Sequence, residues 1–364
     1  MTEKAEGAPP ARRGWRWLGL FWAACLALFA VGAAILAWLG PPPAPEAAES
    51  PAPPGATPEV PAAAAPAPAP PPPLPTLAAG QASPHIDGRL VEPSPQGLLP
   101  RIGADGRMPM RVYARPFDRN DPRPRAALVV GGLGMNTALT EQAIQSLPPA
   151  VGLAFSPYAP RPYPLLERAR ERGFETLVAI PMEPTGFPLN DPGQQALLTG
   201  LAWTENARRL DWVLSRYAGH AGAIGALGPL RGERFAAMAE PHGQMQAVLA
   251  QRGLYYIDPR AGAPSPARAW GRSLDVVVDE PPSRAEIELR LAELERLARE
   301  RGAALGYAGE ASPVAIARIA AWAAGLEARG VVLAPPSALA RAPSPEMPPR
   351  AETPAPRPAT PSRP

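Results

Sequence analysis

The chain has 364 residues, of which 55 are proline and only one is cysteine, and its formal net charge is +3. A single cysteine rules out an intrachain disulfide and a cysteine-based metal site. The basic residues are scattered among acidic ones and form no stripe with interleaved aromatic residues, so we expect no nucleic-acid partner.

The first predicted element is a transmembrane helix at residues 17–39, a run of 23 positions without a charged side chain. At about 1.5 Å per residue, the run is long enough to cross a hydrocarbon core of about 30 Å. Three arginines precede it, and the next basic residue after it is Arg89. The positive-inside rule then predicts a single-pass protein of the bacterial inner membrane whose C-terminal domain lies in the periplasm.

A cleaved signal peptide is the alternative, because Ala44 and Ala47 resemble the small residues of a cleavage site. The apolar run exceeds the roughly 7–15 residues of a signal-peptide core, which favours the membrane anchor. Two proline-rich segments are expected to be disordered, because their composition cannot bury enough apolar surface to fold. The predicted organisation is a cytoplasmic tail (1–12), an anchor (13–40), a linker (41–84), one folded domain (85–340) and a tail (341–364).

Within the folded domain, short apolar runs alternate with amphipathic stretches. Such alternation, repeated about seven times, predicts an α/β fold with a parallel sheet or barrel of about seven strands covered by helices. In both architectures, functional residues gather at the C-terminal ends of the strands. The predicted strands are 126–132, 151–157, 176–182, 223–228, 254–258, 275–279, 303–307 and 331–336, and the predicted helices are 137–147, 161–172, 204–217, 236–252, 283–301 and 312–328.

The glycine-rich turn after the first strand, LVVGGLGMN (128–136), does not fit a nucleotide site. A dinucleotide-binding turn needs G-x-G-x-x-G, and counting from Gly132 the third glycine is replaced by Thr137. No acidic residue stands where the ribose ligand is expected, and the domain has no lysine for a phosphate-binding loop. We therefore expect no nucleotide partner.

Three carboxylates at strand ends are the candidate catalytic residues: Glu183, Asp258 and Asp279. Glu183 lies in the loop PMEPTGFPLNDPG, and a buried ion pair with Arg260 is the structural alternative for Asp258. None of the three histidines stands at the C-terminal end of a predicted strand. A histidine-based metal site is therefore not expected, and we predict neither a metal nor another cofactor.

Five segments together resemble the divergent polysaccharide deacetylase family over about residues 95–340. The segments are RAALVVGGLG, PMEPTGFPLNDPG, LDWVLSRYAGHAGAIG, RGLYYIDPR and GLEARGVVLAPPSAL, of which PMEP followed by NDPG is the most specific. The resemblance implies a distorted (β/α) barrel related to carbohydrate esterases. It also implies removal of acetyl groups from amino sugars by a carboxylate base and a metal that Asp and two His hold.

The residues that this resemblance requires are missing from the chain. The acidic pair expected after the first strand falls on Gly131 and Gly132, and the Asn-His segment falls on residues 227–229. The late histidine falls on Tyr307. The resemblance therefore implies a deacetylase fold that has lost its metal site.

Three hypotheses follow for the function. The favoured one is a catalytically inactive deacetylase-like domain that binds a cell-wall glycan or an envelope protein. The others are an active hydrolase that uses Glu183, Asp258 and Asp279 in an unrecognised arrangement, and a structural envelope protein that docks a protein partner. The predicted binding groove is lined by Gly131, Gly132, Ser156, Tyr158, Met182, Glu183, Asn190, Asp191, Asp258, Arg260 and Tyr307.

Overall fold

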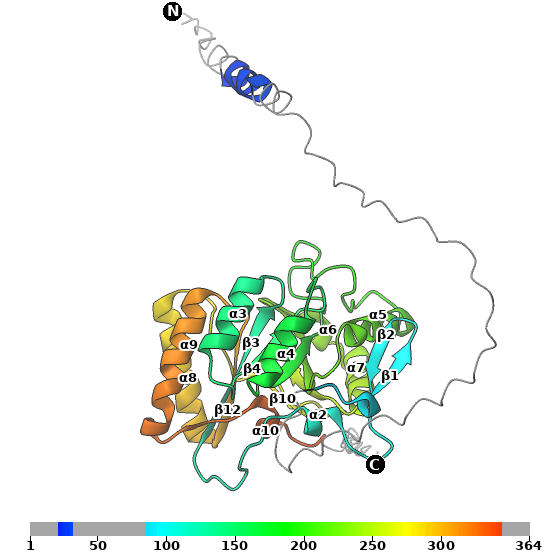
Figure 1. Cartoon of the computed structure of the whole chain (residues 1–364), viewed down its shortest axis with the longest axis vertical. Coiled ribbons are helices and arrows are strands. Elements are labelled where there is room, and N and C mark those ends of the chain that lie inside the picture. Colours follow the sequence, from blue (N-terminus) through cyan, green and yellow to red (C-terminus); the bar gives the residue numbers. More distant parts are fainter. Residues whose placement is uncertain (1–20, 32–84, 344–364) are drawn as a thin grey trace, which may run out of the picture. The chain divides into compact units, whose positions relative to one another are not determined.

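The computed structural model describes residues 21–31 and 85–343. Residues 21–31 form a helix with exposed side chains, and residues 85–343 form a separate folded unit (Figure 1). Within these two ranges, no helix combines the length and the hydropathy needed to cross a membrane. The predicted cytoplasmic tail and linker lie outside the described residues. So do most of the C-terminal tail and both ends of the predicted anchor.

The folded unit is an α/β domain built on a curled, open sheet that forms a half-barrel. Eight strands pair in the order β10-β9-β6-β5-β4-β3-β12-β11, and every pairing is parallel. A short ninth strand, β13 (Val332–Leu333), pairs with the first residues of β3. The strands on the main path are β3 (Arg125–Leu133), β4 (Gly152–Phe155), β5 (Thr176–Ala179), β6 (Gly222–Ile224), β9 (Tyr255–Asp258), β10 (Gly271–Ser273), β11 (Val276–Val277) and β12 (Ala303–Ala308).

All six predicted helices are confirmed. Side chains mark several of their starts: Asn136, Ser283 and Ser312 each accept a hydrogen bond from a backbone N–H in the first turn. These caps satisfy donors that have no partner within the helix. The helices are α3 (Thr137–Ser146), α4 (Tyr163–Glu171), α5 (Trp203–Ser215), α7 (Ala239–Gln251), α8 (Arg284–Arg301) and α9 (Pro313–Leu326).

The structure departs from the sequence prediction in three places. β10 was not predicted, because its sequence Gly-Arg-Ser has no apolar run. The predicted strand 223–228 divides at Gly225 into β6 and a hairpin of β7 (Ala226–Leu227) and β8 (Leu230–Arg231). The entry segment is also ordered, with η1 (Gly88–Leu90), the hairpin β1 (Val91–Ser94) and β2 (Gly97–Pro100), and α2 (Pro109–Val112).

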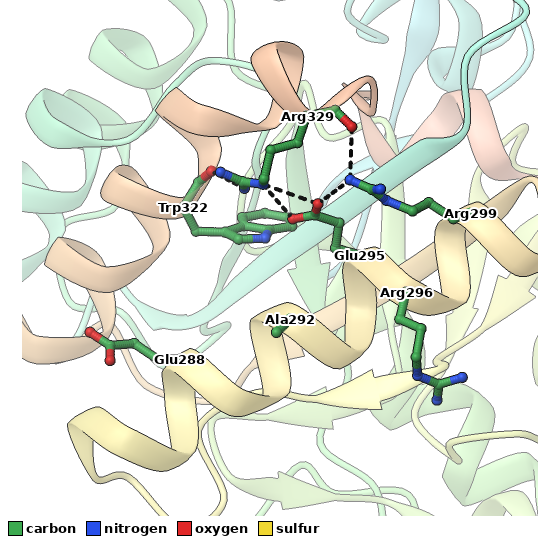
Figure 2. Close-up of a pocket in the computed structure, with 7 residues that line it drawn as sticks. All are labelled: Glu288, Ala292, Glu295, Arg296, Arg299, Trp322 and Arg329. Atoms are coloured by element: carbon green, nitrogen blue, oxygen red, sulfur yellow. Dashed lines mark hydrogen bonds and ion pairs between the residues drawn. The ribbon is translucent and has the colours of Figure 1, made fainter.

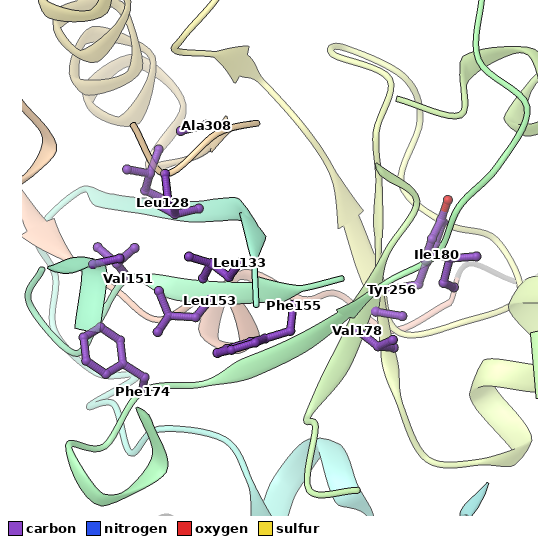
Figure 3. Close-up of a cluster of buried hydrophobic side chains, with 14 of the residues drawn as sticks. Leu128, Leu133, Val151, Leu153, Phe155, Phe174, Val178, Ile180, Tyr256 and Ala308 are labelled. Carbon is purple, nitrogen blue, oxygen red and sulfur yellow. The ribbon is translucent and has the colours of Figure 1, made fainter. Parts of the chain in front are cut away.

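Both faces of the sheet are buried, which explains the continuous apolar runs of its strands. Along β3, Leu128 and Val130 face the helix-covered core shown in Figure 3. Ala127 and Val129 alternate with them and face a second core. The entry segment and the C-terminal helix α10 (Pro336–Leu339) cover that second face.

A buried carboxylate, Glu175, joins the two covering segments to the sheet. Its oxygens accept hydrogen bonds from the backbone N–H of Arg115 (2.9 Å) and of Ser337 (3.1 Å). They also accept bonds from the hydroxyls of Ser337 and Tyr255. Burial raises the pKa of Glu175, and the four donors oppose part of that shift. This residue therefore connects the entry segment, α10 and β9 at one point.

Replacing Glu175 with alanine is expected to lower the free energy of unfolding by about 3 kcal/mol. The substitution leaves the buried N–H groups of Arg115 and Ser337 without acceptors. Urea denaturation followed by circular dichroism measures the loss. Glu171→Ala, at an exposed position of α4, is the control and should change stability by less than about 0.5 kcal/mol. Equal losses in the two variants would contradict the assigned role of Glu175.

Candidate functional site at the strand ends

The loops that follow the parallel strands meet at one edge of the sheet, and contacts link them to one another. The Tyr158 hydroxyl, after β4, accepts a hydrogen bond from the backbone N–H of Gln195, after β5 (3.1 Å). Arg234 Nε, after β8, lies 3.0 Å from a carboxylate oxygen of Glu183. These contacts join the loops after β4, β5 and β8, and they involve two of the sequence-predicted residues, Tyr158 and Glu183.

Gly131, Gly228 and Tyr307 pack together at the centre of this edge. The buried Tyr307 hydroxyl donates a hydrogen bond to the Gly228 carbonyl (2.7 Å). A Cβ on Gly131 would overlap that same hydroxyl, and a Cβ on Gly132 would lie 3.0 Å from the Gly309 carbonyl. Gly132 also has a φ of +69°, which favours glycine. The structure therefore brings together the three positions at which the family resemblance expects metal ligands.

These three positions do not fit a metal ion. The two glycines contribute no side chain, and Gly228 uses its carbonyl to accept the bond from Tyr307. Burial raises the pKa of the Tyr307 phenol well above its ordinary value, so the oxygen stays protonated and neutral. Across residues 21–31 and 85–343, no cluster of three His, Cys, Asp or Glu side chains has the geometry to bind a metal.

Glu183 is buried and fully engaged with neighbouring loops. One carboxylate oxygen accepts bonds from the backbone N–H (2.6 Å) and the hydroxyl (2.7 Å) of Thr199. The other oxygen pairs with Arg234, and the Glu183 carbonyl accepts the N–H of Phe235 (3.1 Å). This carboxylate joins the loop after β5 to the segment after β8.

Asp258 at the end of β9 forms the ion pair that the sequence offered as its structural alternative. Arg260 binds it through Nε (3.0 Å) and Nη2 (2.7 Å), and the Arg260 backbone N–H adds a third bond. His242 Nε2 lies 3.8 Å from the same carboxylate and 3.1 Å from the Tyr256 hydroxyl. No histidine was predicted at the C-terminal end of a strand. In the structure, however, His242 in the first turn of α7 lies beside the end of β9.

Asp279 binds only backbone donors among the described residues. Its two oxygens accept the N–H groups of Gly309 and Glu310, both at 2.9 Å. The neighbouring Glu280 pairs with Arg231 (3.1 Å), which also pairs with Glu233. Within residues 85–343, no hydrogen bond joins any two of the three predicted catalytic carboxylates, each of which has its own partners.

The remaining predicted groove residues hold loops in place. Ser156 Oγ accepts the N–H of Tyr158, whose ring packs on Trp212 at 5.6 Å between centroids. Met182 is fully buried beside Gly225 and Gly232. The other two, Asn190 and Asp191, form hydrogen bonds within their own exposed loop.

The sequence prediction missed three residues that complete this network: Thr199, Arg231 and Arg234. The two arginines belong to the segment RGERF, which begins at Arg231, the last residue of β8. Three charged residues stand close together in this segment, just after the predicted strand 223–228. This cluster of charge was the sequence signal that could have identified the two arginines. Thr199 lies 16 residues beyond Glu183, and only the closed loop between them brings the two together.

A cavity of about 570 Å³ lies away from the strand ends, against α8 and α9 (Figure 2). Figure 2 shows Arg299 and Arg329 converging on Glu295, which pairs with them at 2.5 and 2.9 Å. These ion pairs therefore join α8 to η2 (Glu327–Arg329), the short 3-10 helix that follows α9. The cavity is lined by Glu288, Ala292, Glu295, Arg296, Arg299, Trp322 and Arg329.

Gly131→Ala is expected to lower the free energy of unfolding by about 2 kcal/mol, because its methyl group overlaps the Tyr307 hydroxyl. In a Tyr307→Phe background the same substitution should cost measurably less, since the hydroxyl is gone. Chemical denaturation of the double-mutant cycle tests this coupling. Gly200→Ala, at an open position, is the control. If the free-energy costs of Gly131→Ala and Tyr307→Phe simply add in the double variant, the methyl group and the hydroxyl do not compete for the same space.

Stability is also expected to fall on acidification from pH 7 to pH 5, because of two buried histidines. Burial lowers the pKa of His220 and of His242 to about 4, against 6.5 in the unfolded chain. Between these values the unfolded chain binds protons that the folded chain does not, so the free energy of unfolding decreases as pH falls. The His220→Gln, His242→Gln double variant should show a flatter profile in urea titrations. A profile unchanged by both substitutions would be inconsistent with neutral histidines in the folded chain.

Comparison with known proteins gives one family and several similar structures. No curated protein matches the chain. An uncharacterized protein from Agrobacterium tumefaciens C58 is 34% identical over 67% of this chain and 99% of its own, with a TM-score of 0.62. A family 4 carbohydrate esterase from Streptomyces lividans in complex with acetate is 15% identical, covering 62% and 99% of the two chains (TM-score 0.35). A CE4 esterase from Streptococcus mutans is 12% identical, covering 59% and 87% (TM-score 0.36).

The family assignment rests on a direct match to the chain. Residues 128–340 match the model of the divergent polysaccharide deacetylase family. This range contains Gly131, Gly132, all three candidate carboxylates and Tyr307. The chain belongs to the divergent polysaccharide deacetylase family.

Proposed function

We propose that this chain is a membrane-anchored, periplasmic member of the divergent polysaccharide deacetylase family that has no catalytic activity. It acts instead by binding a cell-wall glycan or a protein of the envelope. The anchor in this proposal is the uncharged run 17–39, whose length matches that of a hydrocarbon core.

The observation that carries the loss of activity is the packing of Tyr307 over Gly131. A carboxylate at position 131 and the Tyr307 hydroxyl would occupy the same space. Deacetylation by a metal-activated water needs ligands that position the ion and leave a coordination site open. A protonated phenol that is hydrogen-bonded to a backbone carbonyl neither positions the ion nor provides an open coordination site.

An active hydrolase is the second candidate, and one contact favours it. His242 lies 3.8 Å from Asp258, and a histidine beside a carboxylate is a common general base. Two features weigh against this function: Arg260 already neutralises Asp258, and His242 is buried with a lowered pKa. Inactivity therefore remains the better proposal.

The test is a paired measurement on the purified full-length chain in detergent. We expect less than about 0.1 zinc per chain by metal analysis and no acetate release from acetylated chitooligosaccharides or peptidoglycan above the buffer rate. The physical reason is the absence of side-chain ligands at positions 131, 132 and 228. An active esterase assayed alongside serves as the positive control.

Two results would overturn the proposal. The first is stoichiometric zinc that remains after dialysis. The second is acetate release that His242→Gln or Asp258→Asn abolishes, which would establish the second candidate. Retention on washed cell-wall sacculi distinguishes glycan binding from protein binding. Only a glycan-binding domain should be retained on purified wall.

A further inference from the structure

Two cavities adjoin across α5. One, of about 480 Å³, lies between α5, the end of α7 and the two strands of the entry hairpin. The other, of about 490 Å³, lies between the first half of α5 and the turn of the same hairpin. Ala207 and Asp211 line both cavities, so we call the two together the α5 groove. Figure 1 shows the hairpin β1–β2 beside α5 and α7.

Arg252, at the end of α7, holds two carboxylates of the groove in place. Its side chain is only 17% exposed, and it donates to Glu92 on β1 (3.1 Å) and to Asp211 on α5 (3.2 Å). Each carboxylate uses one oxygen for this bond, and within residues 85–343 its second oxygen has no hydrogen-bond partner. The side chains of Glu92 and Asp211 are 44% and 39% exposed, so a ligand can reach both free oxygens.

Trp203, the first residue of α5, gives the groove an aromatic surface. It is partly buried against the helix-covered core and also lines the second cavity. A ring that the core already holds in position loses little conformational entropy when a ligand covers it. Gln251 and Thr204 add an amide and a hydroxyl, and neither group forms a hydrogen bond within the folded unit that the structure describes.

The charges around the groove balance one another. Three guanidinium groups are matched by three carboxylates when Glu205, which pairs with Arg208 at 2.8 Å, is included. The arginines are Arg101, Arg208 and Arg252, and the acidic residues are Glu92, Glu205 and Asp211. An ion of either sign would gain little net Coulombic attraction there, so the lining favours an uncharged, hydroxyl-rich ligand.

We propose that the α5 groove binds an uncharged segment of a cell-wall glycan, with one sugar ring against Trp203 and the hydroxyls of another on Glu92 and Asp211. A pyranose ring has apolar C–H faces and a rim of hydroxyl donors, which match an aromatic ring and carboxylate acceptors. Trp203 and Asp211 are separated along α5 by about 12 Å at 1.5 Å per residue, so they contact different sugars of one strand. Each cavity also falls within the roughly 300–1,000 Å³ of ligand sites.

This inference rests on the proposed function, in which the chain acts by binding, and it assigns the binding to a glycan and to a new place. Arg252 lies three residues before the first residue of β9, at the N-terminal edge of the sheet. Gly131, Tyr307 and the three candidate carboxylates lie at the opposite edge. Loss of the metal ligands at the strand ends therefore leaves the α5 groove unchanged.

The test measures binding of the purified full-length chain in detergent to washed cell-wall sacculi, with soluble acetylated chitooligosaccharides as competitors. These uncharged oligosaccharides should displace the chain from the wall. Ala207→Trp fills the point where the two cavities adjoin and should lower the affinity at least about tenfold. Ala292→Trp is the matched control, because it fills the separate cavity against α8 shown in Figure 2, and it should leave the affinity unchanged.

Asp211→Asn is the second variant, and it keeps the shape of the side chain. It should lower the affinity about fivefold, because a hydrogen bond to a charged acceptor becomes one to a neutral acceptor. Circular dichroism melting curves establish that each variant is folded. Should Ala207→Trp fail to fold, Asp211→Asn decides the question.

Several outcomes would overturn the glycan-binding proposal. These are no retention of the unmodified chain on sacculi, retention with which chitooligosaccharides do not compete, and equal losses from Ala207→Trp and Ala292→Trp. Retention without competition would assign the binding to a peptide or protein of the wall. An affinity that neither Ala207→Trp nor Asp211→Asn changes would place the site elsewhere. Zinc and acetate assays on the unmodified chain test the loss of activity separately, so failure of the groove and failure of the proposed inactivity are distinguishable.

Discussion

The space above Gly131 holds either a side chain from β3 or the hydroxyl of Tyr307, but not both. In this chain the tyrosine fills it, and its bond to Gly228 draws the β7–β8 hairpin onto the end of β12. Gly309 packs against Gly228 in the same layer. Segments separated by nearly 180 residues thus meet in close contact, and the loops at this edge take their positions from that contact.

This packing changes what the strand ends offer to a ligand. Glu183, Asp258 and Asp279 already have protein partners, so a polar substrate would exchange one set of hydrogen bonds for another with little net gain. The three buried carboxylates at this edge therefore offer little net free energy for binding a polar ligand.

The sequence predicted the helices and most strands because those elements bury continuous or periodic apolar faces. It failed for β10 and the entry hairpin, which are held by backbone pairing and carry little apolar signal. The positions of Glu183, Asp258 and Asp279 were predicted correctly, because each lies at or within four residues of the end of a strand. Their partners could not be predicted, because Thr199 and His242 reach them through loop closure and helix packing.

The packing that holds this domain together lies mainly on the two faces of the sheet. Its two cores lie on the faces of the sheet, and Glu175 joins the covering segments beneath them. Gly131 and Tyr307 add to this packing at the strand ends, because the phenol fills the space that a side chain at position 131 would need. A scaffold held together by its cores can host many functions, so the residues at the strand ends, and not the fold, decide what this chain can do.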